Sequence, residues 1–323
     1  MTLPNELTLS NRTSDALTAA HLYYMQDLTM DAIAHELHTS RSSISRLLSQ
    51  ARASGLVDIQ IRSPLDATSS LEKVILDRYH VAAHVVPVPD HASDVDRLER
   101  VALSVARILG QFFDSNMTMG IAWGSTMNAI SRHVTPKRTH NSQIVQLNGA
   151  GNMRTTGLDY ASEILRRFGD AFGAHVEQFP VPTFFDDPAT RQALWRERGV
   201  IRLLELQGRM DVALFGLGSP FSDVPSHVYA GGYLEDADFD ALGQSGVVGD
   251  VATIFFRADG STDGIPLNQR STGPDFAVLR RTPRRICVVS GSSKLASLRG
   301  ALAARVITDL YIDEGTARAL ADS

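Results

Sequence analysis

The chain has 323 residues and a formal net charge of −5 at pH 7, with 43% hydrophobic and 21% charged residues. This length is enough for two domains and an ordinary hydrophobic core, and no apolar run approaches the roughly 20 residues that a membrane-spanning helix needs. The N-terminal segment lacks the basic region and apolar core of a secretory signal. The single cysteine, Cys287, excludes an intramolecular disulfide and a cysteine-rich zinc site. These features predict a cytoplasmic protein with no membrane partner.

Residues 28–61 carry the most informative pattern in the chain. Thr29 is a candidate N-cap for a first short helix, and Ser40 is a candidate N-cap for a second helix over residues 41–53. Hydroxyl side chains suit these positions because they accept hydrogen bonds from the unpaired amides of the first helical turn. Apolar residues recur at helical spacing in both segments. The residues at 57, 59 and 61 then alternate as they would in a strand. This order predicts a winged helix-turn-helix.

The predicted second helix presents a polar face that suits contact with DNA. It combines short hydroxyl side chains with arginines and contains no acidic residue. An arginine can bond two acceptors on a guanine edge, and a serine can bond a base or a phosphate. Residues 38–62 carry four arginines against one aspartate, a local net charge of about +3 by subtraction. An ordinary solvated helix face would look similar. We expect the DNA contacts to come from Thr29, Ser40, Arg41, Ser42, Ser43, Ser45 and Arg46.

A second domain is predicted to follow a boundary at Ser63 and Pro64, since proline resists strand pairing. Strand-like apolar runs then alternate with amphipathic segments, which is typical of a mostly parallel sheet with helices on both faces. The predicted strands are 84–88, 117–122, 143–147, 176–179, 212–216, 251–256, 285–289 and 310–312. The predicted helices are 67–79, 94–113, 125–133, 158–168, 188–197, 200–207, 235–244, 293–304 and 315–321, after a helix at 13–26 in the first domain. We therefore expect an α/β protein: a small winged helix-turn-helix domain, residues 1–63, and a large Rossmann-like, doubly wound domain, residues 64–323.

Polar and small residues cluster where the predicted strands end, which is where ligands bind in parallel sheets. Amides and hydroxyls at a helix start can hold a phosphate. Side-chain amides and a carboxylate can bond sugar hydroxyls, and a lysine can meet the phosphate charge. Each feature also has an ordinary alternative: a helix cap, a glycine turn, a solvated acid or an exposed lysine. We expect the effector site to comprise Gly124, Ser125, Thr126, Gln146, Asn148, Gly149, Gly218, Asp250 and Lys294.

Several alternative functions lack their sequence signatures. No Gly-x-Gly-x-x-Gly segment follows a strand and opens a helix, and no Gly-x-x-x-x-Gly-Lys-Ser/Thr loop is present. The ten histidines show no metal-ligand spacing, so we expect neither a cofactor nor a metal. A sugar-phosphate isomerase or deaminase with an attached DNA-binding domain stays open as an alternative, with Asp250 as the one candidate general base. The loops suited to ligands argue against a purely structural DNA-binding protein.

Several sequence motifs occur in a fixed order along nearly the whole chain. They are AAHLYYMQDLTMDAIAHELHTSRSSISRLLSQARASGLVDIQI in the first domain, and GIAWGSTMNAI, QLNGAG, LFGLGS, GDVATIFF, VVSGSSK and DLYIDEGTARAL in the second. Through these motifs the chain resembles the SorC family of bacterial sugar-responsive transcriptional regulators. The resemblance implies a homodimer or homotetramer that binds operator DNA and changes its DNA affinity when a sugar or sugar phosphate binds.

The resemblance also implies roles for particular residues. The family's second domain is related to ribose-phosphate isomerases and glucosamine-phosphate deaminases but serves as a sensor. By motif position, residues 124–126 and Lys294 would hold the phosphate, while Asp250 and residues 146–151 would face the sugar. Family members often have Gly-Gly-x-x-Lys where this chain has Ser-Gly-Ser-Ser-Lys at residues 290–294. The lysine is kept and the extra glycine is not, which bears on the geometry of this loop.

Overall fold

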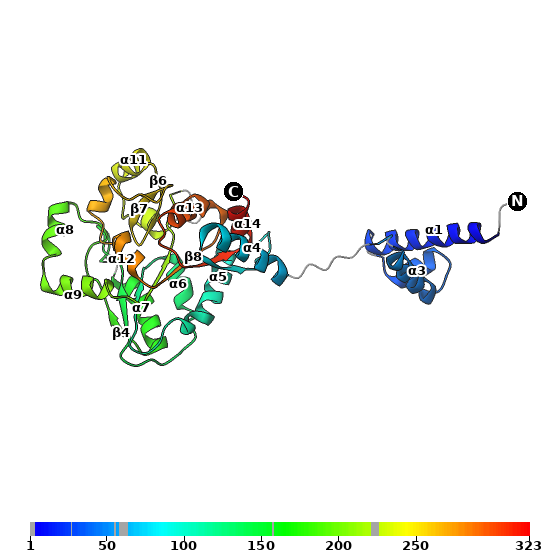
Figure 1. The fold of residues 1–323 in the computed structure, drawn as a ribbon, viewed down its shortest axis with the longest axis horizontal. Helices are drawn as coiled ribbons and strands as arrows, with labels where there is room; N and C mark the ends of the chain where they lie inside the picture. Colours follow the sequence, from blue (N-terminus) through cyan, green and yellow to red (C-terminus); the bar gives the residue numbers. More distant parts are fainter. Residues whose placement is uncertain (1–3, 27, 55, 58–63, 157, 221–225) are drawn as a thin grey trace. The chain divides into compact units, whose positions relative to one another are not determined.

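A computed structural model describes the protein as two compact units, Met1–Ser63 and Pro64–Ser323 (Figure 1). The described residues exclude 1–3, 27, 55, 58–63, 157 and 221–225, together with the side chains of 4–13, 64–67 and 158. Most of the predicted wing therefore lies outside the described residues. None of the described helices is long and apolar enough to cross a bilayer.

The described residues of the first unit form three helices around a small core. They are α1 (Pro4–Tyr24), α2 (Met30–Glu36) and α3 (Arg41–Ala53). Helix α1 begins well before the predicted start at residue 13. Both expected N-caps are present: the Ala32 amide donates to Thr29 Oγ1 at 3.2 Å, and the Ser43 amide donates to Ser40 Oγ at 3.1 Å. The core residues are Ala16, Ala19, Ala20, Leu22, Ile33, Ala34, Ile44, Leu48 and Ala51.

The turn between α2 and α3 is closed by backbone hydrogen bonds. The Thr39 amide donates to Ala34 O at 2.9 Å, and the His38 amide donates to His35 O at 3.3 Å. This pair of bonds is the Schellman arrangement, in which the residue after the C-cap adopts a left-handed conformation. Here that residue is His38, with φ +49°. Glycine usually occupies such a position because a Cβ atom is strained there.

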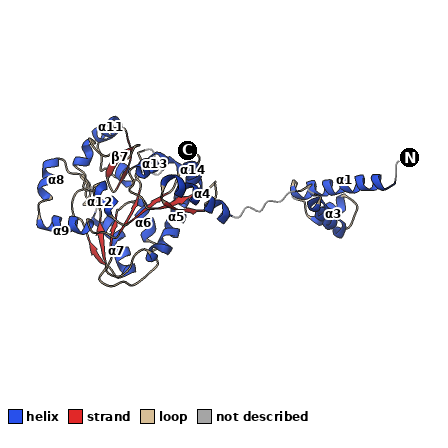
Figure 2. Cartoon of the chain, in the orientation of Figure 1, coloured by secondary structure: helices blue, strands red, loops and turns tan. Residues whose placement is uncertain are grey.

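The second unit contains a parallel sheet, which confirms the predicted α/β fold. In the described part of the chain seven strands pair in the order β1-β9-β8-β5-β2-β3-β4, all parallel. Figure 2 shows them in red among the helices of this unit. Their bounds are β1 (Ala82–Val86), β2 (Thr118–Ile121), β3 (Gln143–Gln146), β4 (His175–Glu177), β5 (Val212–Gly216), β8 (Arg284–Val289) and β9 (Asp309–Asp313).

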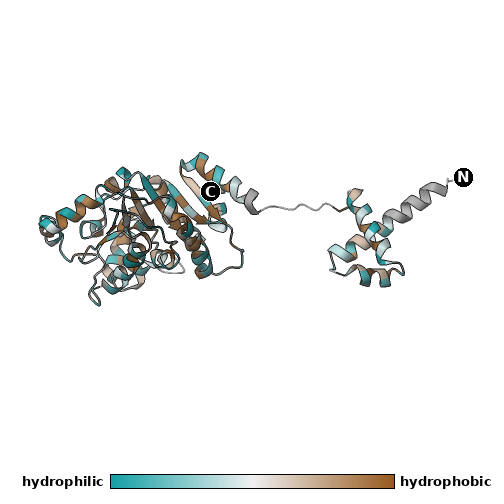
Figure 3. Ribbon diagram, turned by 90° about the horizontal axis from the view of Figure 1, so that it is seen from below, coloured by the Kyte–Doolittle hydropathy of each residue, from teal (hydrophilic) through white to brown (hydrophobic). Residues whose placement is uncertain are grey.

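Helices bury both faces of this sheet. Helices α5 (Asp94–Ile108), α6 (Ser125–Ser131) and α7 (Leu158–Phe172) pack into one apolar cluster. Helices α4 (Pro64–Tyr79), α9 (Arg198–Gln207), α12 (Phe276–Arg281), α13 (Leu295–Ala303) and α14 (Glu314–Ala321) pack into the other. Along β5, Val212 and Leu214 face the first cluster, whereas Ala213 and Phe215 face the second. Figure 3 shows polar and apolar residues side by side along these helices, as expected of amphipathic segments.

Shorter elements complete the second unit. They are α8 (Pro188–Leu194), α10 (His227–Ala230), α11 (Asp236–Gln244), and the 3₁₀ turns η1 (Leu109–Gln111), η2 (Pro266–Gln269) and η3 (Ser292–Lys294). The segments α10 and α12 were not predicted, because four to six residues are too few to show a helical period.

The prediction of a sheet strand over residues 251–256 was wrong. This segment belongs to an antiparallel hairpin of β6 (Val247–Val251) and β7 (Ile254–Arg257), separate from the parallel sheet. Ala252 and Thr253 form its two-residue turn, with φ of +46° and +69°. Such turns usually contain Asn-Gly or a similar pair, which makes them recognisable in the sequence. Because this turn has no glycine, the sequence reads as one unbroken apolar run.

Candidate functional site

The main candidate site is a cavity at the carboxyl ends of β2 and β5. The chain leaves β2 towards β3 on one side and leaves β5 towards β8 on the other, so the connections diverge here. Crevices at such divergence points are the usual ligand sites of open parallel sheets.

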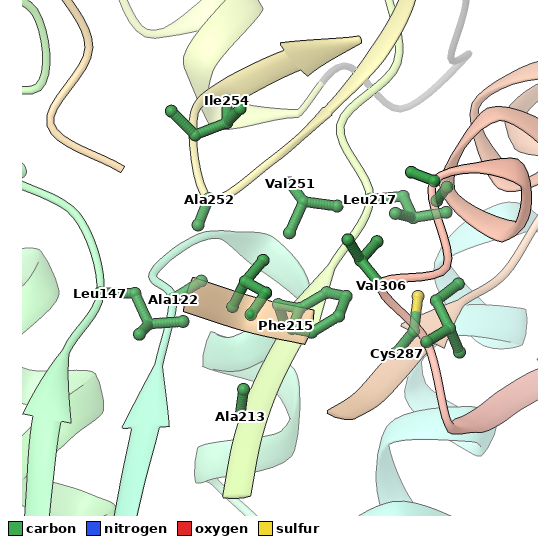
Figure 4. Close-up of a cluster of buried hydrophobic side chains, with 14 of the residues drawn as sticks. Ala122, Leu147, Ala213, Phe215, Leu217, Val251, Ala252, Ile254, Cys287 and Val306 are labelled. Carbon is green, nitrogen blue, oxygen red and sulfur yellow. The ribbon is translucent and has the colours of Figure 1, made fainter. Parts of the chain in front are cut away.

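Most of the predicted effector residues meet in this cavity. The lining includes Gly124, Ser125, Thr126, Asn148, Gly218, Asp250 and Lys294. They come from the segments after β2, β3, β5 and β8 and from β6, which are far apart in the sequence. The apolar part of the lining includes Ala122, Leu217 and Ala252. Figure 4 shows these three residues in the same apolar cluster as Phe215.

Gln146 and Gly149 lie outside the cavity lining and shape the neighbouring loop. Gln146 Nε2 donates to Asn148 O at 2.7 Å, and its Oε1 accepts from the Phe179 amide at 3.0 Å. The Gly149 carbonyl accepts from Trp123 Nε1 at 2.8 Å. A Cβ atom on Gly149 would overlap the carbonyl oxygen of Val181. The small residue at 149 is therefore explained by close backbone packing.

Asp250 contributes a buried carboxylate to the cavity lining. The side chain is buried, and its Oδ2 accepts from the Thr253 amide at 3.0 Å. No hydrogen bond of good geometry to its Oδ1 is found among the described residues, although the Tyr229 side chain lies close enough to lower the pKa of the carboxyl. The Asp250 and Gly218 backbones exchange two hydrogen bonds, of 3.0 and 3.2 Å, which fix the position of the carboxylate. Burial raises the pKa of Asp250 from 3.8 to about 6, against the opposing effects of the Thr253 amide, Tyr229 and the Lys294 ammonium.

Further buried polar atoms lack hydrogen-bond partners within the described part of the chain. They include Asn148 Oδ1, Ser226 Oγ and Tyr229 Oη. Asn148 and Ser226 line the cavity. Burial and the neighbouring Asp250 charge raise the pKa of Tyr229, which keeps its hydroxyl protonated. Buried polar groups are nearly always paired, and leaving one unpaired costs about 1–3 kcal/mol. The unpaired atoms of Asn148, Ser226 and Asp250, three residues of the cavity lining, therefore favour a polar ligand.

Lys294 brings a buried amine to the same cavity. Its side chain is 7% exposed, and no carboxylate in the described ranges lies within 4.0 Å of its ammonium group. Burial lowers its pKa, while the Cys287 thiol, Asp250 and Asp94 act in the opposite direction. A buried cation without a close counter-ion favours an anionic partner.

An aromatic wall at the cavity was not anticipated from the sequence. Trp123 and His227 line the cavity. The Trp123 ring lies 5.1 Å from that of Tyr233, and the His227 ring lies 4.9 Å from that of Tyr160. Burial lowers the pKa of His227, so the ring is neutral near pH 7. The sequence around residue 227 lacks any period or motif that could have pointed to this wall.

The second candidate site is the polar face of α3 in the first unit. Ile44, Leu48 and Ala51 are buried on the opposite side. Thr29 and Ser40 serve as helix caps. Arg41 Nε lies 3.7 Å from Asp31 Oδ2, with both side chains exposed. The remaining predicted residues are Ser42, Ser45 and Arg46, which are exposed, and Ser43, which is half-buried.

Comparison with known proteins agrees with these features. Residues 63–321 match the family model described as a sugar-binding domain (Sugar-bind). The deoxyribonucleoside regulator of Bacillus subtilis strain 168 is 31% identical over 308 residues, which cover 94% of this chain and 96% of that protein.

Solved structures similar to the chain include the following two. A domain described as that of a possible sugar-binding transcriptional regulator from Arthrobacter aurescens TC1 is 56% identical, with TM-score 0.75, over 80% of this chain and 100% of that one. The full-length sorbitol operon regulator SorC from Klebsiella pneumoniae, at 22% identity, shares the fold over 96% of this chain and 99% of that one, with TM-score 0.71. The chain thus belongs to the SorC family of sugar-responsive transcriptional regulators.

Proposed function

We propose that the cavity between β2 and β5 binds a sugar phosphate, and that this ligand sets the affinity of the α3 helix for operator DNA. The observation that carries the proposal is the convergence of unpaired groups of two kinds. Lys294 offers a buried ammonium, while Asp250 Oδ1 and Asn148 Oδ1 offer buried acceptors. A ligand that satisfies both must combine an anionic group with hydroxyl donors, as a phosphorylated sugar does.

The cavity walls suggest how such a ligand would be oriented. Its phosphate would lie at Lys294 and the segment Gly124–Thr126, where backbone amides and hydroxyls begin α6. Its hydroxyls would donate to Asp250 and Asn148. The apolar face of the sugar ring would rest against the aromatic wall that includes Trp123.

Operator binding is assigned to α3. Arg41 and Arg46, with Ser42, Ser43 and Ser45, would contact bases and phosphates in the major groove. A homodimer or homotetramer would place two such helices on the half-sites of one operator, and the avidity of paired units would offset the acidic net charge. Such a regulator acts in the cytoplasm.

We propose binding without turnover. Among the cavity-lining residues of the described chain, Asp250 is the sole carboxylate and His227 the sole imidazole. Asp250 is fixed against the Thr253 amide by Oδ2, and the Gly218 backbone holds it in place. The carboxylate packs against Gly218, and we infer that it recognises hydroxyl groups of a ligand. The B. subtilis relative is named a regulator.

Calorimetry on the full chain tests this assignment with ribose 5-phosphate, glucose 6-phosphate, the two unphosphorylated sugars and inorganic phosphate as probes. At least one phosphorylated sugar should bind to the wild type, and Lys294→Ala should weaken that binding by roughly tenfold or more, since the loss of a charge-assisted contact to phosphate costs about 1.5–3 kcal/mol. Lys73→Ala removes an exposed lysine elsewhere and should leave binding unchanged. Equal affinities for the wild type and Lys294→Ala would reject the phosphate assignment. Conversion of the sugar, followed by NMR, would reject the absence of turnover.

A further inference from the structure

The side chain of Asp313 holds four hydrogen bonds from three parts of the second unit. Asp313 ends β9 and is fully buried. Its Oδ2 accepts from the Gly291 amide at 3.0 Å and from Thr316 Oγ1 at 2.6 Å. Its Oδ1 accepts from the Thr316 amide at 3.1 Å and from Arg97 Nη1 at 3.2 Å. One carboxylate therefore joins the loop before Lys294, the first turn of α14 and a cation on α5.

The Gly291 contact ties this carboxylate to the effector cavity. Gly291 has φ +90°, a conformation that strains any residue with a Cβ atom. Its carbonyl accepts from the Lys294 amide at 3.1 Å and so begins the turn that carries the lysine into the cavity. Lys294 is thus bonded to Gly291, and the Gly291 amide is in turn bonded to Asp313.

The other end of α14 is bonded to α4. Arg78 Nη1 donates to Ala321 O at 3.3 Å, and Tyr79 Oη donates to Leu320 O at 3.5 Å. Leu320 and Ala317 of α14 lie in the same buried apolar cluster as Ile75 of α4. Helix α4 begins at Pro64, the first residue of the second unit. It therefore follows the DNA-binding unit directly in the sequence.

We propose that Asp313 is a positioning residue that links the Lys294 loop, through α14, to α4, the helix joined to the DNA-binding unit. The chain of contacts is Lys294 to Gly291, Gly291 to Asp313, Asp313 to the start of α14, and the end of α14 to Arg78 and Tyr79. The regulatory meaning of this link rests on the proposed binding of an effector at Lys294. The mechanical link itself does not, so it is tested without any ligand or DNA.

The competing explanation is that Asp313 merely caps α14. A cap would be satisfied by the Thr316 amide and hydroxyl alone. The same buried carboxylate also accepts hydrogen bonds from the Gly291 amide and the Arg97 guanidinium, which a helix cap does not require. Arg97 in turn donates to Ala92 O at 3.1 Å and to Asp90 O at 2.6 Å, so Asp313 also steadies the connection from β1 to α5.

Amide hydrogen exchange of the full chain measures the link directly. Gly291→Ala strains the Lys294 loop, and Gly246→Ala strains a remote turn at φ +67° where a Cβ meets no neighbour. We expect Gly291→Ala to speed exchange in α14 and α4 by about threefold or more relative to α9, a helix outside the chain of contacts. Gly246→Ala should leave the ratio between α4 and α9 unchanged. Equal effects of the two variants on α4 would overturn the proposal.

A double-mutant comparison isolates Asp313. In an Asp313→Asn background, Gly291→Ala should alter exchange in α4 less than it does in the wild type, because asparagine has a single acceptor oxygen for the four donors that the carboxylate binds. An undiminished effect would mean that the strain travels by another route, which refutes the role of Asp313.

If Asp313→Asn does not fold, the far end of α14 provides the same comparison. In the combined variant Arg78→Ala and Tyr79→Phe, the effect of Gly291→Ala should still reach α14 but not α4. Arg318→Ala removes an exposed α14 arginine that pairs within its own helix with Glu314, and it should leave the transmission intact. Persistence of the effect in α4 after the Arg78 and Tyr79 changes would overturn the proposal.

Discussion

Replacement of Asp250 by asparagine should stabilise the unliganded protein at neutral pH. The folded-state pKa of about 6 lies about 2 units above the ordinary value of 3.8 because the carboxyl is buried. Each unit corresponds to about 1.4 kcal/mol, so the ionised carboxylate costs the folded state about 3 kcal/mol above pH 6. The side chain is only 4% exposed, so solvent screening does not reduce this figure substantially. Asparagine has nearly the same shape and does not ionise.

The pH dependence gives the sign of the effect. Because the folded state binds the Asp250 proton more tightly than the unfolded state does, the wild type loses stability from this group as the pH rises from about 4 through about 6. The advantage of Asp250→Asn should therefore be about 3 kcal/mol at pH 8, about half of that at pH 5, and close to zero below pH 4.

Urea unfolding followed by tryptophan fluorescence is a suitable assay. Both tryptophans, Trp123 and Trp195, lie in the second unit, so the signal reports the unit that contains Asp250. Asp240→Asn changes an exposed acid on α11 and serves as the control. The same Asp250→Asn protein should bind sugar phosphates more weakly, because an ionised acceptor is lost. If Asp250→Asn is no more stable than the wild type at pH 8, or if its advantage does not vary with pH, the proposed cost of burying this carboxylate is wrong.

Three further substitutions test other parts of the structure. Arg46→Ala should lower affinity for duplex DNA, selected from a random pool by the wild type, by about 1–3 kcal/mol at fixed salt; an equal loss in Arg52→Ala, which lies in the last turn of α3, would reduce the effect to general charge. His38→Gly should slow amide exchange in α2 and α3, since it relieves about 0.5–1 kcal/mol of left-handed strain; faster exchange would show that the histidine side chain stabilises the turn. Gly218→Ala should destabilise the second unit by about 2 kcal/mol or more in urea unfolding, because its Cβ would overlap Asp250 Oδ1. That loss should shrink in an Asp250→Ala background, whereas strict additivity would contradict the overlap.

The parallel sheet could be predicted because its strands leave direct traces in the sequence. Strands buried on both faces are short apolar runs, and β5 shows this in Val212–Gly216, where prediction and structure agree residue for residue. The caps of α2 and α3 could be predicted for the same reason, since Thr29 and Ser40 bond amides three residues away. Structural features that depend on residues close together in the sequence can be predicted without knowledge of the fold.

The details of the cavity depend on contacts between residues that are far apart in the sequence. Such contacts cannot be predicted from the sequence alone. Gln146 was expected to face the ligand, yet it bonds Phe179 and the backbone of its own loop. His227 and Tyr229 were not expected at all, because α10 has only four residues. The turn at Ala252 and Thr253 carries no glycine, so the hairpin that presents Asp250 could not be distinguished from a sheet strand.

The unpaired groups in the cavity bear on how a small ligand could control DNA binding. A ligand shifts an equilibrium only through a difference in affinity for the two states, and couplings of about 1–3 kcal/mol change affinity roughly 5–150-fold. The buried Asp250 carboxylate alone costs about 3 kcal/mol, which hydroxyl donors of a ligand could offset. The left-handed turn at Ala252 and Thr253, bonded to the same carboxylate, adds strain of about 1–3 kcal/mol for each residue. Relief of these costs in one quaternary arrangement and not in the other would supply the whole coupling, without any rearrangement of the apolar core. The energy for regulation would then come from the polar lining of the cavity. The buried, unpaired groups of this lining destabilise the empty state, and a ligand that pairs with them would remove that cost.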